Sequence, residues 1–289
     1  MLSLSTDPLD KAADDDRELA MSTTALEDRT ILNADPGGSP DGPPLRIEPC
    51  ERRVRVVLAG RTVADSTAVK YLFERDHLPV YYFPLGDVDR SLLERSEKTT
   101  HCPRKGDASY WSVRVGDRLA RDAVWGYESP IEAATQIAGH VAFYWKQFDH
   151  WYEEDEEVFV HARDPYKRVD TLPGSRHVRI ERDGVLLAET RRPVLVFETG
   201  IATRFYIPRE DVAMNVLRES ETVSQCPYKG RASYLSAQIG SELVRDLAWT
   251  YTFPVPEAPR LEQLIAFFDE RVDTWVDGEP RPRPVSAWS

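Results

Sequence analysis

The sequence is poor in cysteine and has no long apolar run. Its 289 residues include three cysteines, Cys50, Cys102 and Cys226, and no two of them form a Cys-x-x-Cys pair. A disulfide framework or a cysteine-rich zinc site is therefore not expected. No apolar stretch approaches the ~20 residues of a membrane-spanning helix, and the N-terminal residues are acidic where a signal peptide would be basic and then apolar. We expect a cytoplasmic protein with no membrane partner.

Basic charge is scarce as well. The formal net charge is −12 at pH 7, with 37 lysines and arginines against 49 aspartates and glutamates. A nucleic-acid partner normally requires a basic stripe, so we expect none here. The sequence also lacks a Walker loop, a Gly-x-Gly-x-x-Gly segment and a His-Glu-x-x-His motif. We therefore expect no cofactor and no metal.

The negative charge is concentrated near the N-terminus. Residues 1–48 contain about eleven acids against four bases, and few large apolar residues. Such a segment cannot bury enough apolar surface to offset the entropy lost on ordering, so we predict a disordered acidic tail. Across the whole chain 41% of residues are apolar, which is enough for two domain cores of ordinary size.

What the chain does contain is one domain written twice. Residues 54–151 align with residues 178–275 at a constant offset of about 124, without a gap and with about a third of the positions identical. The densest match is Cys-Pro-x-Lys-Gly-x-Ala-Ser-Tyr, which begins at Cys102 and again at Cys226. We predict a tail at 1–48, a first domain at 49–151, a connecting segment packed on the domains at 152–176, a second domain at 177–276 and a flexible tail at 277–289.

Within each copy the hydrophobic period is mostly two, which is typical of strands. A short helix is also expected, with Asp87 or Asp211 as its N-cap. A closing helix is expected over residues 131–148 and 261–272, where apolar residues fall at helical spacing. The predicted class is therefore mainly β (α+β). The strands predicted for the first copy lie at 54–58, 69–73, 80–84, 110–115 and 122–127.

The repeated Cys-Pro-x-Lys-Gly segment is the best candidate for chemistry. Cys-Pro gives an extended residue followed by a turn, and Lys-Gly lets the chain bend before the next strand. A ligand could approach the backbone at Gly106, the ammonium of Lys105 could hold an anion, and a cysteine beside a lysine can be reactive. The structural alternative is a folding turn with a buried cysteine and a surface lysine.

Aromatic residues form a second repeated pattern, which could line a slot for a flat or cationic ligand or could belong to the core. Glu74 and Glu198 stand at the ends of apolar strands, where a carboxylate lies either at a rim or in a site. We assign no catalytic residues. The candidate ligand-binding residues are Glu74, Tyr82, Cys102, Lys105, Gly106, Ser109, Tyr110, Trp125 and Tyr127 in the first copy, and Glu198, Tyr206, Cys226, Lys229, Gly230, Ser233, Tyr234, Trp249 and Tyr251 in the second.

The Cys-Pro-x-Lys-Gly segment, the later Trp-x-Tyr with Pro130 or Pro254, and the apolar stretch near the end of each copy resemble a bacterial family, the domain of unknown function DUF427. The joining residues 163–170 are also similar to that family. The resemblance implies two tandem domains of the β-tent type, similar to the Mss4-like and methionine sulfoxide reductase B folds. Several tent proteins hold zinc through Cys-x-x-Cys pairs, which this sequence lacks, so the metal is not carried over.

Three functions fit these observations. The first is binding of an unknown small molecule in a pocket of each copy, beside the Cys-Pro-x-Lys-Gly turn. The second is an enzyme that uses the cysteine or lysine of that turn; a nucleotidyltransferase-like label is attached to the family, but the Gly-Ser followed by paired aspartates of such enzymes is missing here. The third is a two-lobed scaffold for protein interactions. Arg104 against Tyr228 and Trp111 against Leu235 indicate that two pockets would differ.

Overall fold

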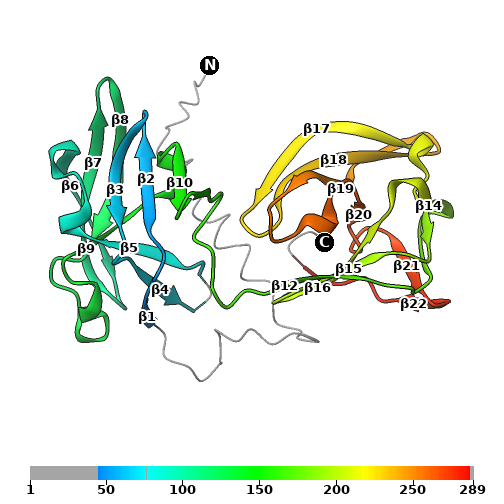
Figure 1. Ribbon diagram of the computed structural model, residues 1–289, viewed down its shortest axis with the longest axis horizontal. Helices are drawn as coiled ribbons and strands as arrows, with labels where there is room; N and C mark the ends of the chain where they lie inside the picture. Colours follow the sequence, from blue (N-terminus) through cyan, green and yellow to red (C-terminus); the bar gives the residue numbers. More distant parts are fainter. Residues whose placement is uncertain (1–44, 76, 287–289) are drawn as a thin grey trace, which may run out of the picture. The chain divides into compact units, whose positions relative to one another are not determined.

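The computed structural model describes residues 45–75 and 77–286, and these are mainly β-strand (Figure 1). The described residues divide into two compact units, one ending at Pro165 and the next beginning at Tyr166. Residues 1–44, most of the predicted N-terminal tail, lie outside the described residues. In the part that is described, no helix is long and apolar enough to cross a membrane.

The first unit consists of two antiparallel sheets. The larger sheet has seven strands in the order β1 (Leu45–Pro49), β4 (Lys70–Glu74), β5 (Val80–Pro84), β9 (His140–Phe143), β8 (Arg118–Gly126), β7 (Gly106–Val115) and β6 (Leu93–Cys102). The smaller sheet has four strands in the order β11 (Glu156–Glu157), β10 (His150–Glu153), β2 (Val54–Leu58) and β3 (Arg61–Ser66).

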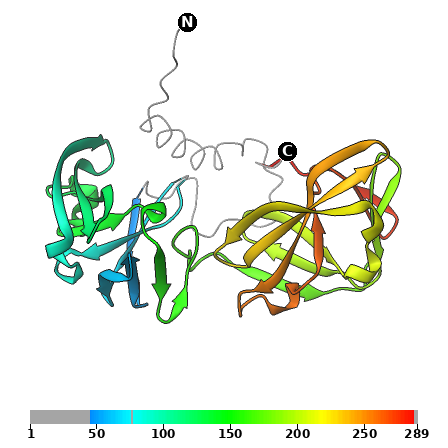
Figure 2. The same cartoon turned by 90° about the horizontal axis from the view of Figure 1, so that it is seen from above.

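The second unit repeats this architecture, and its strands form two layers in Figure 2. The larger sheet runs β12 (Val169–Pro173), β15 (Val194–Glu198), β16 (Ile201–Ile207), β20 (Ile265–Phe267), β19 (Glu242–Pro254), β18 (Gly230–Ile239) and β17 (Leu217–Cys226). The smaller one runs β14 (Val185–Thr190), β13 (Val178–Arg182), β21 (Asp273–Val276) and β22 (Glu279–Arg281). The strand order is the same in both units, so the duplication in sequence is a duplication in structure.

The main core of each unit lies between its two sheets, because the central strands turn an apolar face toward the other sheet. Along β2 the residues alternate between buried and half-buried, and Val54, Val56 and Leu58 are buried. Along β5, Tyr81 and Phe83 join this core, while Tyr82 between them joins a second apolar cluster on the opposite face of the larger sheet. The larger sheet is therefore covered on both faces.

The closing helices predicted at 131–148 and 261–272 are wrong. In the first repeat this stretch contains a 3-10 turn (Glu132–Ile137), then β9, then another 3-10 turn (Trp145–Gln147). In the second repeat it contains a 3-10 turn (Pro259–Leu261) followed by β20.

The reason is burial on both sides. Val141 and Phe143 of β9 pack in the main core and Ala142 packs on the opposite face, so three consecutive residues are apolar. Together with the apolar residues before and after it, such a run in a central strand also fits the spacing of a helix. Gly139 and Gln263, with φ of +70° and +58°, also lie in a conformation that no right-handed helix contains.

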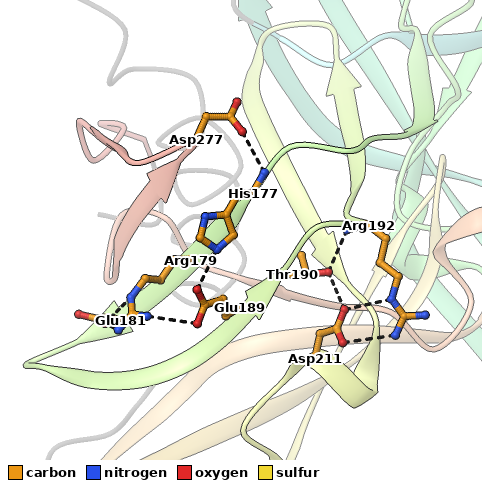
Figure 3. A network of polar contacts seen from close by, with 8 residues as sticks. All are labelled: His177, Arg179, Glu181, Glu189, Thr190, Arg192, Asp211 and Asp277. Carbon is orange, nitrogen blue, oxygen red and sulfur yellow. Dashed lines mark hydrogen bonds and ion pairs between the residues drawn. The ribbon is translucent and has the colours of Figure 1, made fainter.

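The short helix of each repeat is present only as pairs of 3-10 turns, and its predicted N-caps are wrong. Asp87 accepts a hydrogen bond from Ser66 Oγ at 2.6 Å instead of capping. Asp211 accepts from Thr190 Oγ1 at 2.6 Å and pairs with Arg192 (Figure 3). Both carboxylates therefore tie a turn to the smaller sheet, and the rest of that sheet's surface carries further ion pairs such as Arg179 with Glu189.

Parts of the predicted tails and of the connecting segment are strands. Residues 45–48, which we placed in the N-terminal tail, begin β1 and pair with β4. Residues 279–281, which we placed in the C-terminal tail, form β22 and pair with β21. Residues 279–281 contain no apolar side chain other than that of Pro280, and residues 45–48 contain only two, so both runs form strands because a partner edge is available. Within 152–176, β11 pairs with β10 in the first unit and β12 pairs with β15 in the second.

Candidate functional site

The Cys-Pro-x-Lys-Gly segment is a tight turn between two long neighbouring strands, β6 and β7 in the first repeat and β17 and β18 in the second. The amide of Lys105 donates to the carbonyl of Cys102 at 3.1 Å, and the carbonyl of Lys105 accepts from the amide of Ile131 at 3.1 Å. Gly106 and Gly230 have φ of +102° and +104°. The sequence needs glycine at these positions because other residues rarely adopt that conformation.

On the side where a side chain would stand, each glycine is in contact with the protein itself. A Cβ on Gly230 would lie 3.1 Å from the carbonyl oxygen of Phe253 and 3.2 Å from the amide of Val255. On Gly106 the nearest atom would be the carbonyl oxygen of Ser129, at 3.4 Å. The close approach at each glycine is therefore made by the protein's own next loop.

The lysine of the turn is buried in an ion pair. Lys105 donates a hydrogen bond to Glu74, and Arg104 contacts the same carboxylate at 3.1 Å. In the second repeat Lys229 donates to Glu198, and Lys167 supports that carboxylate at 3.3 Å. The two candidates that we found separately in each copy thus form one unit, and the lysine charge is already balanced by a carboxylate.

Electrostatics in the second repeat favour the charged form of both partners. Burial would raise the pKa of Glu198, but the ammonium groups of Lys229 and Lys167 outweigh it and hold that pKa below its ordinary value. Burial would lower the pKa of Lys229, but the carboxylate of Glu198 outweighs it and raises that pKa. This pair is therefore fully ionised at neutral pH.

The repeated aromatic residues lie on the face of the larger sheet that points away from the main core. We call this cluster the aromatic face of each repeat. Small residues, Ala108 and Ala142, separate the rings in the first repeat, as Ala232 and Ala266 do in the second. Its rings are Tyr82, Tyr110, Trp125 and Tyr127 in the first repeat, and Tyr206, Tyr234, Trp249 and Tyr251 in the second.

Several rings of the aromatic face are interior residues. Tyr82 and Tyr206 are each 1% exposed, and burial raises the pKa of Tyr206 to about 12. The Tyr206 hydroxyl accepts a hydrogen bond from the indole Nε1 of Trp249 at 3.0 Å. The charges of Lys229 and Glu198 also act on Tyr206, so the ion pair and the aromatic face are neighbours. Tyr82 and Tyr206 therefore lie in the interior, beneath the ion pair of each turn.

Of the eight rings only Trp125 and Tyr234 are half-buried, and the other rings, Trp249 among them, are buried. Trp125 is half-buried and its ring centroid lies 4.5 Å from that of Tyr144. In the second repeat Trp249 lies 4.6 Å from Phe268. The sequence analysis missed Tyr144 and Phe268, although both are aromatic at the repeat offset, because we assigned their segments to helices. Each aromatic face therefore has a tryptophan paired with a second ring.

Among the remaining candidates, Ser109 and Ser233 each lie between two residues of the aromatic face on β7 and β18, so their side chains point to the opposite face of the sheet. Cys102 is a free, half-buried thiol that packs against the aromatic face, and Cys226 is also half-buried. Ser109 accepts a hydrogen bond from Arg95 at 2.9 Å and donates to Glu128 at 3.1 Å. Ser233 is half-buried. The hydroxyls of Tyr110 and Tyr234 bond to Thr100 and Ser224 on the neighbouring strands, at 2.8 Å and 2.9 Å.

Fold and site together define a protein of two tandem two-sheet domains, each with an aromatic face and a buried lysine–glutamate pair. A family model described as a domain of unknown function (DUF427) matches residues 46–154 and again residues 170–278. The chain therefore belongs to the DUF427 family, as a member with two copies of the domain. The comparison with curated proteins finds no match.

Proposed function

We propose that each repeat binds a small molecule with a flat ring on its aromatic face, beside the Cys-Pro-x-Lys-Gly turn. One observation carries the proposal: all four rings of the aromatic face are the same in both repeats, whereas the main core has changed. Tyr71, Tyr81 and Trp111 in the first core are replaced by Leu195, Phe205 and Leu235 in the second.

A purely structural cluster tolerates such exchanges if its volume is kept, as the main core demonstrates. Retention of every ring, together with the lysine, glutamate and cysteine beside them, indicates a shared constraint beyond packing. That constraint fits ligand binding, because pockets are built from apolar and aromatic side chains with a few placed polar groups.

The arrangement also indicates what kind of ligand fits. Trp125 and Tyr144 are half-buried and offer ring surfaces on which a flat molecule can stack; in the matching pair of the second repeat Trp249 is buried and the half-buried ring is Phe268. The lysine of each turn is paired with a glutamate, and a second cation, Arg104 or Lys167, contacts the same carboxylate, so these charged groups already have partners within the protein. We infer an uncharged heteroaromatic ligand in place of the anion first considered for the lysine.

The test is a binding screen with matched variants. Nucleobases, indoles and flavins are screened by thermal shift and native mass spectrometry against the full chain and against Trp125→Leu, Trp249→Leu and the double variant. Trp111→Leu is the control, because the second repeat already carries Leu235 at that position. Two bound molecules in the parent and in the control, one in each single variant and none in the double variant support the proposal. A ligand that remains bound to the double variant, or no ligand for the parent, rejects it.

We also infer that each repeat is a β-tent of the Mss4-like type and that the protein works in the cytoplasm. The pairing of a seven-stranded with a four-stranded sheet and the family membership support the first inference. The three free cysteines support the second.

A further inference from the structure

The second repeat contains a buried cluster of charges that the first repeat does not have. Arg204 on β16 is 6% exposed and donates two hydrogen bonds to Glu270, at 2.8 Å and 2.5 Å. It also donates to Asp269 at 3.3 Å. The side chain of Glu270 is completely buried. At the corresponding positions the first repeat has Val80, Trp145 and Lys146.

This cluster touches the aromatic face of the second repeat. Arg204 and Tyr206 are two residues apart on β16, so their side chains point to the same face of the sheet. The guanidinium carbon of Arg204 lies 6.0 Å from the ring centroid of Trp249, within the range of a cation–π contact. Trp249 is also held by Tyr206 and by Phe268. The arginine is therefore one of the side chains that fix the position of this indole.

The C-terminal segment, residues 282–286, covers the same cluster. Ser286 donates a hydrogen bond to Glu270 at 2.6 Å, and Arg283 pairs with Asp273 at 2.7 Å. Pro282 and Pro284 line a cavity of about 30 Å³ together with Asp269. The segment thus closes directly over the carboxylates that orient Arg204.

We propose that residues 282–286 form a strap that, through Ser286, Glu270 and Arg204, positions Trp249 and thereby controls the aromatic face of the second repeat. Arg204 is then a positioning residue of the second site, and the first site has no equivalent control. The consequence for ligand binding rests on the function proposed above, but the positioning of the indole does not.

The physical reason is the environment of Glu270. A buried carboxylate requires donors for its lone pairs, and here Arg204 and Ser286 supply them. Loss of the serine hydroxyl removes one donor, admits water beside the carboxylate and frees the guanidinium to redistribute between Glu270 and Asp269. Since the guanidinium lies against Trp249, the indole then loses a fixed neighbour.

Fluorine NMR of the full chain labelled with 5-fluorotryptophan tests the positioning. The signals of Trp249 and Trp125 are assigned with Trp249→Leu and Trp125→Leu. We expect Ser286→Ala, and a chain ending at Arg281, to shift or broaden the Trp249 signal. Ser286→Thr, which keeps the hydroxyl, restores it. The Trp125 signal stays unchanged throughout and serves as the internal control. An unchanged Trp249 signal in Ser286→Ala overturns the proposal, and this point variant decides alone if the shortened chain fails to fold.

A second measurement separates this proposal from the proposed function. Indole is titrated into the parent chain and into Ser286→Ala, and occupancy of the two repeats is followed through the same two fluorine signals. We expect the affinity of the second site to change by about fivefold or more, with the first site unaffected. If indole and the screened compounds bind neither site, the proposed function fails while the response of Trp249 to Ser286 still decides the strap. A Ser286→Ala variant that shifts the Trp249 signal but binds indole with unchanged affinity overturns the control of the site.

Discussion

Lys229 and Glu198 form a buried ion pair although 31 residues separate them in the sequence. Lys105 and Glu74 form the same pair in the first repeat, with the same separation. Each lysine comes from the turn between two strands on one side of the larger sheet, and each glutamate from the last position of a strand on the other side. The pair therefore fastens the Cys-Pro-x-Lys-Gly turn across the sheet, next to the aromatic face.

Removal of one member of the pair is expected to destabilise the second unit strongly. Lys229→Met keeps most of the side-chain volume but leaves Glu198 buried, with Lys167 as its remaining cation. We expect a loss of about 3 kcal/mol in the free energy of unfolding, measured by urea denaturation, because a buried carboxylate that loses its shorter ion pair is costly even with one cation left. The double variant Glu198→Leu/Lys229→Met removes both charges and recovers most of the loss. Equal instability of the single and double variants would contradict the ion-pair explanation.

The carboxylate of Glu198 is also expected to make the folded chain less stable at acidic pH. The pKa of Glu198 in the folded chain is below its ordinary value of 4.5, so the unfolded chain binds its proton first as the pH falls. Its contribution is complete above about pH 4.5 and is lost as the pH falls further through the folded-state pKa. We expect the stability of Glu198→Gln to depend less steeply on pH than that of the parent below this point. Parallel pH profiles measured by urea denaturation between pH 3 and pH 7 would count against the assignment.

Substitution of the glycine of each turn is expected to destabilise the fold. Gly230→Ala places a Cβ 3.1 Å from the carbonyl oxygen of Phe253 on a backbone with φ of +104°. We expect a loss of more than about 1 kcal/mol in the free energy of unfolding, with a smaller loss for Gly106→Ala, where the nearest atom is 3.4 Å away. Gly86→Ala is the control, since a Cβ there meets nothing within 4 Å. Thermal melting of the three variants ranks their stabilities. A Gly230→Ala variant as stable as the parent would refute the prediction.

Ser112 and Ser236, which occupy the same position in the two repeats, are expected to stabilise a β-bulge. Asp122 and Asp246 adopt φ of +48° and +49° where the registers of β7 with β8 and of β18 with β19 shift. The amide of Asp246 donates to Ser236 Oγ at 3.1 Å, and the amide of Asp122 donates to Ser112 Oγ at 3.0 Å. Ser236→Ala leaves that amide without its acceptor.

We expect this substitution to lower the free energy of unfolding by about 1 kcal/mol, measured by urea denaturation. Ser129→Ala, at an exposed position, provides the comparison and should change it little. If the two substitutions have the same effect, the serine does not support the bulge.

The hydrophobic pattern of the sequence predicts many of the strands. The alternation of Val54, Val56 and Leu58 predicts a strand with one buried face, and β2 has that pattern. The same reasoning failed at 141–143, because a central strand covered on both faces has no alternation. It also could not find β6, whose ten residues include a single apolar one before the terminal cysteine, Leu93. That strand forms because β7 offers its edge, which is a property of the neighbour and not of the strand.

The sequence by itself determined the duplication and most of the list of residues at the candidate site, since both can be read from identities at a fixed offset. Only the tertiary structure decided which of those residues meet: the pairing of Lys229 with Glu198, the stacking of Trp249 on Phe268, and the placement of Ser286 over Glu270 and Arg204. The physical reason is that side-chain alternation depends on neighbouring residues, whereas these contacts depend on strand order and on the path of the chain around the sheet, which join positions tens of residues apart.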